Sequence, residues 1–390
     1  MSSLPAAEAR MLVRLTIALA FFNFIGLVSA RVVLSLYALD LGAPASAVGV
    51  LAGMFYLFPL LLSMTVGSWA DQRGPRGPLL AGSVCGTAAL LIPWFLREVP
   101  AFYVAAALSG LGLAFTHVTL QNLMGVISRP EHRARNFSNF SLVGSMTNFV
   151  GPLIAGFSID HFGHPVACVT VAALTFVAIL LLLVWGRRLP GPKRTAATGG
   201  GGNPLRALAD RSVVRMLLAS GLVQLGTDLF QFYLQIHGHA HGLSATAIGA
   251  VLASFAAATL VVRLALARLV ARYAAEQLLA VSFYIGALGF ALVPFFGNAG
   301  VLAAIAFVFG LGMGIGTPLS VMMMFSQSAE GRSGQALGLR LTTTNLVRMG
   351  GPAVFGAVAV AFGLPPVFWI NAAMMGCGGL LFRGGKTKAR

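Results

Sequence analysis

The chain has 390 residues, of which 57% are hydrophobic and only 9% are charged. Charged residues make up about 25% of an ordinary soluble domain. This composition therefore excludes a soluble globular protein and indicates a polytopic membrane protein. The formal net charge of +16 arises from basic loops on one side of the predicted membrane, so it requires no nucleic-acid partner.

Apolar stretches long enough for a helix to cross a hydrocarbon core about 30 Å thick occur along the whole chain. The first set lies near 12–38, 46–70, 77–96, 100–127, 137–160 and 165–186. The second set lies near 213–236, 244–267, 276–296, 299–325, 335–361 and 366–383. We predict an all-α membrane protein with twelve transmembrane helices, divided into an N-terminal six-helix bundle at 1–186, a cytoplasmic linker at 187–212 and a C-terminal six-helix bundle at 213–390.

Glycines and prolines recur at a spacing of 200 residues. Apolar residues could coincide by chance in such a chain, but glycines and prolines kept in register across both halves indicate one unit copied once. Six helices per copy give the two copies the same orientation in the membrane. The recurring positions include Gly26 and Gly226, Gly151-Pro152 and Gly351-Pro352, and Phe162-Gly163 and Phe362-Gly363.

Basic residues outside the predicted helices fall in alternate loops and at the two termini. The loops on the opposite side contain only Arg97. By the positive-inside rule, the basic loops face the cytoplasm. We therefore predict a multi-pass protein of a bacterial-type inner (plasma) membrane, with both termini in the cytoplasm.

A turn with two glycines, one aspartate and two arginines follows the second predicted helix. Glycines tolerate the positive φ of a tight turn, and a carboxylate there can accept hydrogen bonds from the start of a neighbouring helix. A simpler interpretation is a charged turn that only sets the topology. The segment reads Gly67-Ser68-Trp69-Ala70-Asp71-Gln72-Arg73-Gly74-Pro75-Arg76.

Two parallel six-helix copies joined by a long cytoplasmic link, together with this turn, resemble the major facilitator superfamily of secondary transporters. The resemblance implies alternating access, and it implies that Asp71 latches the two halves in the outward-facing state. The turn matches the family pattern at Gly67, Asp71, Gly74 and Arg76, and departs from it at Gln72 and Pro75.

The predicted helix at 137–160 carries a second family-like pattern, which is similar to the antiporter motif and favours export over import. A Gly-Pro step bends a helix and lets a neighbouring helix approach, although plain kinked packing is the alternative. The arginine usual in the fourth helix of the family's drug/proton antiporters is missing from 105–110, which weakens that subfamily assignment. The motif comprises Gly144, Gly151-Pro152, Ala155 in place of a glycine, and Gly156, and the predicted gating residues are Gly67, Asp71, Gly74, Arg76, Gly151, Pro152, Gly351 and Pro352.

Ionisable side chains inside predicted spans are costly unless they are paired or hydrated, so they typically mark a transport pathway. Asp228 is the only acid well inside a span, and we predict that it carries the coupled proton. Arg31 lies about one turn from Asp228 in the register of the repeat, so we expect an ion pair between them. Any single polar residue could instead only join two helices. The predicted substrate-binding residues are Asn23, Arg31, His117, Gln121, Asn148, Gln224, Gln231, Asn345 and Arg348.

Three histidines, His237, His239 and His241, follow the predicted helix at 213–236. Metal binding needs converging ligands, and we predict a solvated turn with no metal, with a zinc or pH-sensing site as the alternative. The chain has no phosphate-binding loop, no zinc-hydrolase motif and no serine nucleophile elbow. We therefore predict that it is not an enzyme and has no cofactor.

The residues together predict a secondary transporter that exports a small anionic or zwitterionic organic compound by alternating access, with proton antiport. The excess of arginines over acids inside the spans motivates the anionic substrate. A proton-coupled importer of a sugar or organic acid is one alternative, and a membrane receptor or assembly factor that transports nothing is another. The predicted partners are the lipid bilayer, the substrate and protons, and we expect a monomer.

Overall fold

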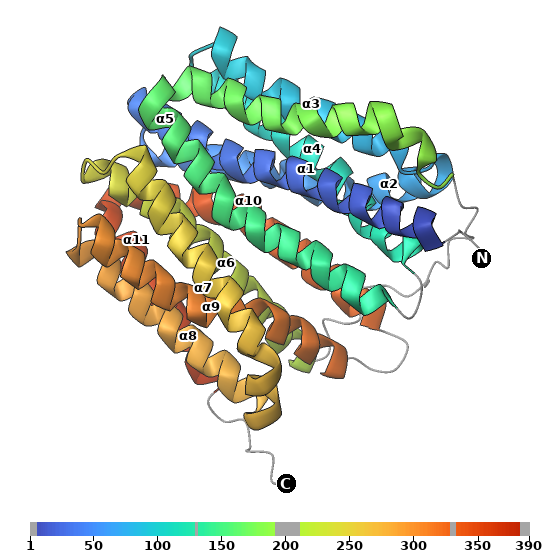
Figure 1. Cartoon of the computed structure of the whole chain (residues 1–390). Helices are drawn as coiled ribbons and strands as arrows, with labels where there is room; N and C mark the ends of the chain where they lie inside the picture. Colours follow the sequence, from blue (N-terminus) through green and yellow to red (C-terminus); the bar gives the residue numbers. More distant parts are fainter. Residues whose placement is uncertain (1–5, 129–131, 192–210, 328–332, 383–390) are drawn as a thin grey trace. The chain divides into compact units, whose positions relative to one another are not determined.

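The computed structural model describes residues 6–128, 132–191, 211–327 and 333–382. These residues form α helices joined by short turns, without a strand (Figure 1), and the predicted all-helical fold is confirmed. The helices are α1 (Ala6–Asp40), α2 (Ala45–Arg73), α3 (Arg76–Phe95), α4 (Val99–Ile127), α5 (Arg133–Trp185), α6 (Arg211–Ala240), α7 (Ala245–Arg272), α8 (Ala275–Leu292), α9 (Ala299–Gln327), α10 (Ser333–Phe362) and α11 (Leu364–Phe382). Short 3-10 turns follow α5 at Gly186–Arg188 and α8 at Val293–Phe295.

The chain divides into two compact units. Unit 1 comprises Met1–Ala43 and Met54–Ala197, and unit 2 comprises Pro44–Gly53 and Thr198–Arg390. The start of α2 is therefore grouped with the second unit, although most of that helix belongs to the first. Much of the predicted linker at 187–212 lies outside the described residues, and the domain boundaries stay a prediction.

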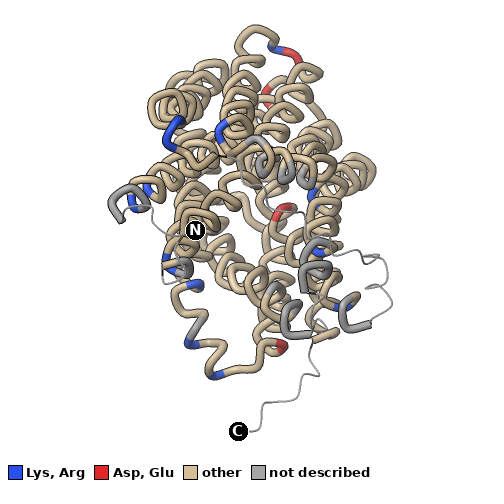
Figure 2. The backbone as a smooth tube through the Cα atoms, turned by 90° about the vertical axis from the view of Figure 1, so that its right-hand side faces the viewer, with Lys and Arg blue, Asp and Glu red and all other residues tan. Residues whose placement is uncertain are grey.

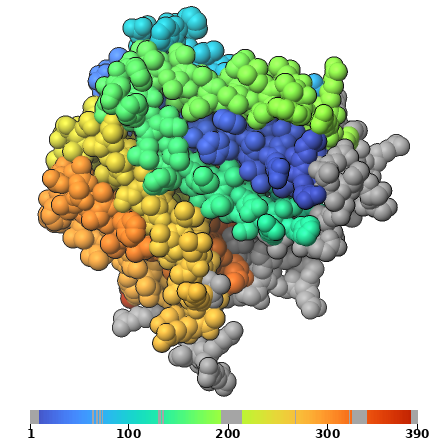
Figure 3. All heavy atoms as spheres, in the orientation of Figure 1, coloured from blue at the N-terminus to red at the C-terminus, as the bar shows by residue number. Residues whose placement is uncertain are grey.

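In unit 1, the most extensive helix contact joins α1 to α5, and α3 packs on α4. The helix α5 has two arms, because Gly163 takes a φ of 77° between the predicted spans at 137–160 and 165–186. Figure 3 shows α1, in blue, between these two arms on the surface of the unit. Leucines such as Leu19 and Leu120, neither of them exposed, fill the core between α1 and α4.

In unit 2, α7 packs on α9, α8 packs on α9 and α11, and α6 packs on α10. An aromatic cluster joins α6 to α8 and α9. The Phe230 ring of α6 stacks on the Phe309 ring of α9, with centroids 3.7 Å apart, and Phe290 of α8 meets Phe309 edge to face at 5.3 Å. This packing places the Phe230 face of α6 against α8 and α9, whereas Asp228 of the same helix bonds α10.

Glycines that recur at the spacing of 200 residues take the same backbone conformation in the turns of both copies. Gly42 and Gly242 both take a positive φ, of 80° and 72°, directly after α1 and α6. Gly163 and Gly363 take φ values of 77° and 85° before prolines. Each of these conformations is strained for a residue with a side chain, so the turns themselves explain why these glycines recur.

Ten helices in the described ranges are long and apolar enough to cross a membrane. One of them, Arg135–Arg188, spans 54 residues and includes both arms of α5. Figure 2 shows how few acidic and basic residues interrupt the tan backbone of the described helices. The polar helix α6 is not among the ten, so the prediction of twelve transmembrane helices is not established by the helices alone.

Candidate functional site

A charged pair inside unit 2 is the centre of the candidate site. Asp228 on α6 accepts a hydrogen bond at Oδ2 from Arg348 Nε of α10, at 3.0 Å, and another from Gln224 Nε2, at 2.8 Å. The Asp228 and Arg348 side chains are 16% and 32% exposed. The carboxylate is therefore held by one arginine and one amide, its charge is balanced, and part of its surface stays exposed.

The local packing of α6 against α10 explains how the pair forms. Tyr233 of α6 donates its hydroxyl hydrogen to the carbonyl of Pro352, at 3.2 Å. A side chain at Gly351 would collide with Leu225 of α6. The predicted Gly-Pro step of the second copy therefore lets α10 approach α6 closely, about one turn from Arg348.

The other polar residues of α6 and α10 extend this site along the two helices. Gln231 donates to the carbonyl of Thr227 at 3.4 Å, and Asn345 is half-buried on α10. Arg340 is buried, and its Nε donates to Ser220 Oγ at 3.2 Å. Sequence reasoning missed Ser220, because a single serine between small and apolar neighbours in α6 gives no signal.

Arg31 in unit 1 has a different environment. Its guanidinium lies over the ring of Tyr56, 4.7 Å from the centroid, and near Phe55, at 5.8 Å. Its Nε is buried and has no hydrogen-bond partner among the described residues. Asp228 belongs to unit 2, where its ion-pair partner is Arg348, and the ion pair that we predict between Arg31 and Asp228 would join the two units and stays a prediction.

The remaining predicted residues of unit 1 have separate hydrogen-bond partners. Asn23 is buried, where Nδ2 donates to the Leu19 carbonyl at 2.8 Å and Oδ1 accepts from Ser83 Oγ at 2.9 Å. His117 and Gln121 are exposed neighbours on α4, with 3.4 Å between their Nε2 atoms. The exposed Asn148 on α5 donates to the Gly144 carbonyl at 2.7 Å.

The predicted motif turn is described in part. Gly74 takes a φ of 82°, as the turn was expected to require. Arg76 lies beside the 3-10 turn after α5, so a side chain at Gly186 would come within 3.2 Å of its Nε. The Asp71 side chain and the surroundings of Gly67 lie outside the described residues, so the latch stays a prediction.

The helix α1 packs directly on the Gly151-Pro152 step of α5. The Ser29 hydroxyl donates to the Gly151 carbonyl at 3.0 Å, and an added Cβ at Gly151 would lie 2.9 Å from Val28 Cγ1. Val28 is stiff and branched, so it cannot move aside without cost. The helix contact therefore requires glycine at position 151.

We expect Gly151→Ala to destabilise the protein by about 1–3 kcal/mol, which is the usual cost of overpacking. The matched control is Gly144→Ala on the same helix, where nothing lies within 4 Å of an added Cβ. That control should be neutral or slightly stabilising, because alanine favours a helix. Thermal unfolding of both variants in detergent would measure the difference, and equal midpoints would contradict the packing account.

Two of the three histidines at the end of α6 bond backbone carbonyls, and His237 is buried rather than part of the predicted solvated turn. His237 Nε2 lies 2.8 Å from the Phe296 carbonyl oxygen, and His241 Nδ1 lies 2.9 Å from the carbonyl oxygen of His237. Within the described ranges, no group of three or more His, Cys, Asp or Glu side chains has the geometry of a metal site. The zinc alternative therefore gains no support here.

Comparison with curated proteins gives distant relatives. The chain is 23% identical to the multidrug resistance protein MdtG of Salmonella paratyphi A over 342 residues, covering 84% of this chain and 82% of that protein. It is 30% identical to the staphylopine export protein of Staphylococcus aureus over 118 residues, covering 30% of this chain and 29% of that protein.

Solved structures share the fold at low sequence identity. A point mutant of the nucleoside transporter NupG superposes with a TM-score of 0.78 at 15% identity, covering 95% of this chain and 98% of that chain. A peptide transporter POT in complex with sulfate superposes with a TM-score of 0.76 at 14% identity, covering 95% and 93%. These likenesses show that the chain shares the fold of these two proteins over most of its length.

The family comparison covers nearly the whole chain. The model described as Major Facilitator Superfamily matches residues 16–296 and again residues 216–389. The second match begins 200 residues after the first, at the spacing of the internal repeat. The chain is thus a member of the Major Facilitator Superfamily.

Proposed function

We propose that this protein exports a small anionic or zwitterionic organic compound in exchange for protons, by alternating access. The observation that carries the proposal is the Asp228–Arg348 pair, in which a half-buried acid and base neutralise each other on two helices of one unit. Protonation of Asp228 removes its negative charge and leaves Arg348 without its counter-ion. The arginine is then ready to receive the anionic group of a substrate.

The balance of charges supports an anionic substrate. Arg31 and Arg340 have no acidic partner in the described structure; the first lies over aromatic rings and the second bonds a serine. A guanidinium inside a membrane protein is costly unless an anion or a polar group satisfies it. A carboxylate or phosphate is the group that suits the planar fork of arginine best.

The direction of transport rests on two weaker observations. Both curated relatives described above have names that refer to export or drug resistance. The Gly151-Pro152 step of α5 also resembles the antiporter motif, and the structure shows why glycine is needed there. Both observations favour export over import.

The membrane arrangement belongs to the same proposal. Counting α5 as two spans and including the polar α6 gives twelve helices. The positive-inside rule then places the N- and C-termini in the cytoplasm of a cell with a bacterial-type inner membrane. We propose that the protein acts as a monomer in the bilayer.

Transport into membrane vesicles of the two orientations tests the proposed function. Inside-out vesicles and right-side-out vesicles would each be incubated, in separate samples, with a small-molecule extract of the expressing cells. Mass spectrometry would identify the compounds that each sample accumulates. An exporter loads inside-out vesicles with an acidic interior, whereas an importer loads right-side-out vesicles with an acidic exterior. A receptor or assembly factor loads neither, and that result or the importer's pattern would overturn the proposal.

The latch at the cytoplasmic turn gives a further prediction. We expect Asp71→Asn to fold and reach the membrane at the native level, but to transport more slowly and favour the inward-open state, since it removes a charged acceptor. Gln72→Asn in the same turn is the matched control and should change neither property. Single cysteines on the cytoplasmic side would report accessibility, and an Asp71→Asn protein with native transport and labelling would exclude the latch.

A further inference from the structure

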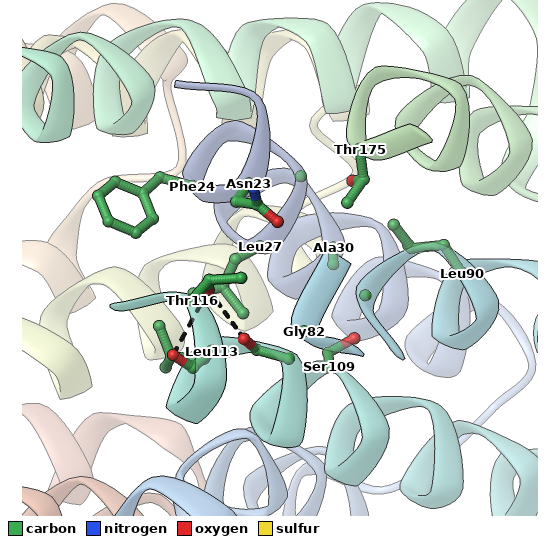
Figure 4. A pocket seen from close by; sticks show the side chains of 13 residues that line it. Asn23, Phe24, Leu27, Ala30, Gly82, Leu90, Ser109, Leu113, Thr116 and Thr175 are labelled. Carbon is green, nitrogen blue, oxygen red and sulfur yellow. Dashed lines mark hydrogen bonds between the residues drawn. The ribbon is translucent and has the colours of Figure 1, made fainter. Parts of the chain in front are cut away.

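A small cavity lies inside unit 1, between α1, α3, α4 and the second arm of α5. Its volume is about 20 Å³, which suffices for one water molecule and for no larger organic ligand. Glycines and alanine form much of the wall. Figure 4 shows four polar side chains around the cavity, which are Asn23, Ser109, Thr116 and Thr175.

The polar atoms of the wall are incompletely satisfied by the protein. Ser109 is 4% exposed, and its Oγ has no hydrogen-bond partner within the described ranges. The Thr116 and Thr175 hydroxyls donate to the carbonyls of Gly112 and Val171, which leaves their oxygens able to accept. A bound water needs two to four such partners, and this wall supplies one free donor and several acceptors.

The corresponding place in unit 2 is filled by apolar side chains. In the register of the repeat, Phe309 replaces Ser109 and Met375 replaces Thr175. A Cβ at Gly226 would lie 2.7 Å from the Met375 methyl carbon, and Phe309 has no exposed surface. Three of the four wall glycines recur, whereas Gly82 is replaced by Ser282, whose hydroxyl donates to the Gly312 carbonyl at 2.7 Å. The unsatisfied hydroxyl of Ser109 therefore has no counterpart at Phe309 in unit 2.

We propose that this cavity binds one structural water molecule, which accepts a hydrogen bond from Ser109 and donates to oxygens of the opposite wall, including that of Asn23. The water then joins α4 to α1 through hydrogen bonds that the side chains alone cannot make. Ala30 belongs to the cavity wall and directly precedes Arg31. The water thus holds α1 in place next to Arg31, whatever the substrate or direction of transport.

Radiolytic hydroxyl-radical footprinting of the full-length protein tests the proposal directly, because X-rays split a bound water in place. Leu90 of α3 lines the cavity and is 1% exposed, and Leu79 of the same helix is unexposed and lies away from it. We expect oxidation of Leu90 and none of Leu79. Thr175→Met, which copies the filled cavity of unit 2, should abolish the oxidation of Leu90.

Oxidation of Leu90 no greater than that of Leu79, or unchanged by Thr175→Met, would overturn the proposal. If Thr175→Met does not fold, Ser109→Val fills the cavity from α4 and should have the same effect. The sign of a stability change gives an independent readout. Ser109→Ala should lower the thermal midpoint if a water bonds the hydroxyl, but raise it if the cavity is dry, because the variant then removes an unsatisfied polar group.

Thr119→Val is the control for this second readout. Thr119 Oγ1 is also buried without a hydrogen-bond partner in the described structure, but it does not line the cavity. Its replacement should not lower the midpoint.

Sodium is the competing occupant of similar size, so the midpoints are compared in sodium and potassium salts. A sodium-dependent rise that Ser109→Ala removes would replace water by sodium and overturn the proposal.

Discussion

Replacing Asp228 or Arg348 by alanine alone is expected to destabilise the protein more than replacing both. Either single change leaves one charge without its counter-ion in a site where the two side chains are only 16% and 32% exposed. The double change removes both charges together. Chemical unfolding of the four proteins in detergent should give a coupling free energy of about 1–3 kcal/mol.

Additive losses in this cycle would show that the two residues act separately. Gln231→Ala combined with Arg348→Ala is the matched control, because Gln231 is on the same helix as Asp228 but bonds the Thr227 carbonyl instead. Its coupling should be close to zero. The charge-reversed pair Asp228→Arg with Arg348→Asp should recover stability relative to either single reversal, but it should not recover proton-driven transport, since the acid has moved to the other helix.

Arg31→Gln is expected to weaken substrate binding strongly while the protein still folds. The guanidinium of Arg31 has an Nε without a hydrogen-bond partner among the described residues and lies against the Tyr56 ring, so we expect it to bind the anionic group of the substrate. Charge-assisted hydrogen bonds worth about 1.5–3 kcal/mol correspond to a loss on the order of 10- to 100-fold in affinity. Concentration dependence of transport should show this loss as a raised KM.

Arg31→Lys distinguishes a general positive charge from the planar fork. Lysine keeps the charge but cannot form two parallel hydrogen bonds to one carboxylate, so its KM should also rise. Tyr56→Phe is the control that keeps the aromatic face under the guanidinium, and its KM should stay close to native. An Arg31→Gln protein with the native KM would remove Arg31 from the substrate site.

The helices, their turns and the internal repeat could be predicted from the sequence, because they depend on the positions of glycine and proline and on the lengths of the apolar stretches. The 200-residue repeat was legible in residues such as Gly42 and Gly242, which take the same backbone conformation. The break between the spans at 137–160 and 165–186 coincides with the kink at Gly163. Each of these features is determined by a local backbone requirement.

The partners of charged residues could not be predicted in this way. The register of the repeat gives the level of a residue along its helix, but not the direction of its side chain or the helix that it meets. Matching levels suggest Arg31 as a partner of Asp228, but they give no sign of the bond to Arg348, which is 120 residues away on α10. The unsatisfied hydroxyl of Ser109 was equally hidden, because a serine among small residues resembles ordinary helix packing.

The most direct test of the central claim compares two transport modes of Asp228→Asn in the same vesicles. With a compound identified by the vesicle experiment, one assay measures accumulation driven by an imposed pH gradient, and the other measures exchange of labelled for unlabelled compound without a gradient. We predict that the variant loses gradient-driven accumulation and retains exchange, because asparagine can still accept hydrogen bonds but cannot carry the proton. Gradient-driven accumulation at the native rate in this variant would contradict proton coupling through Asp228.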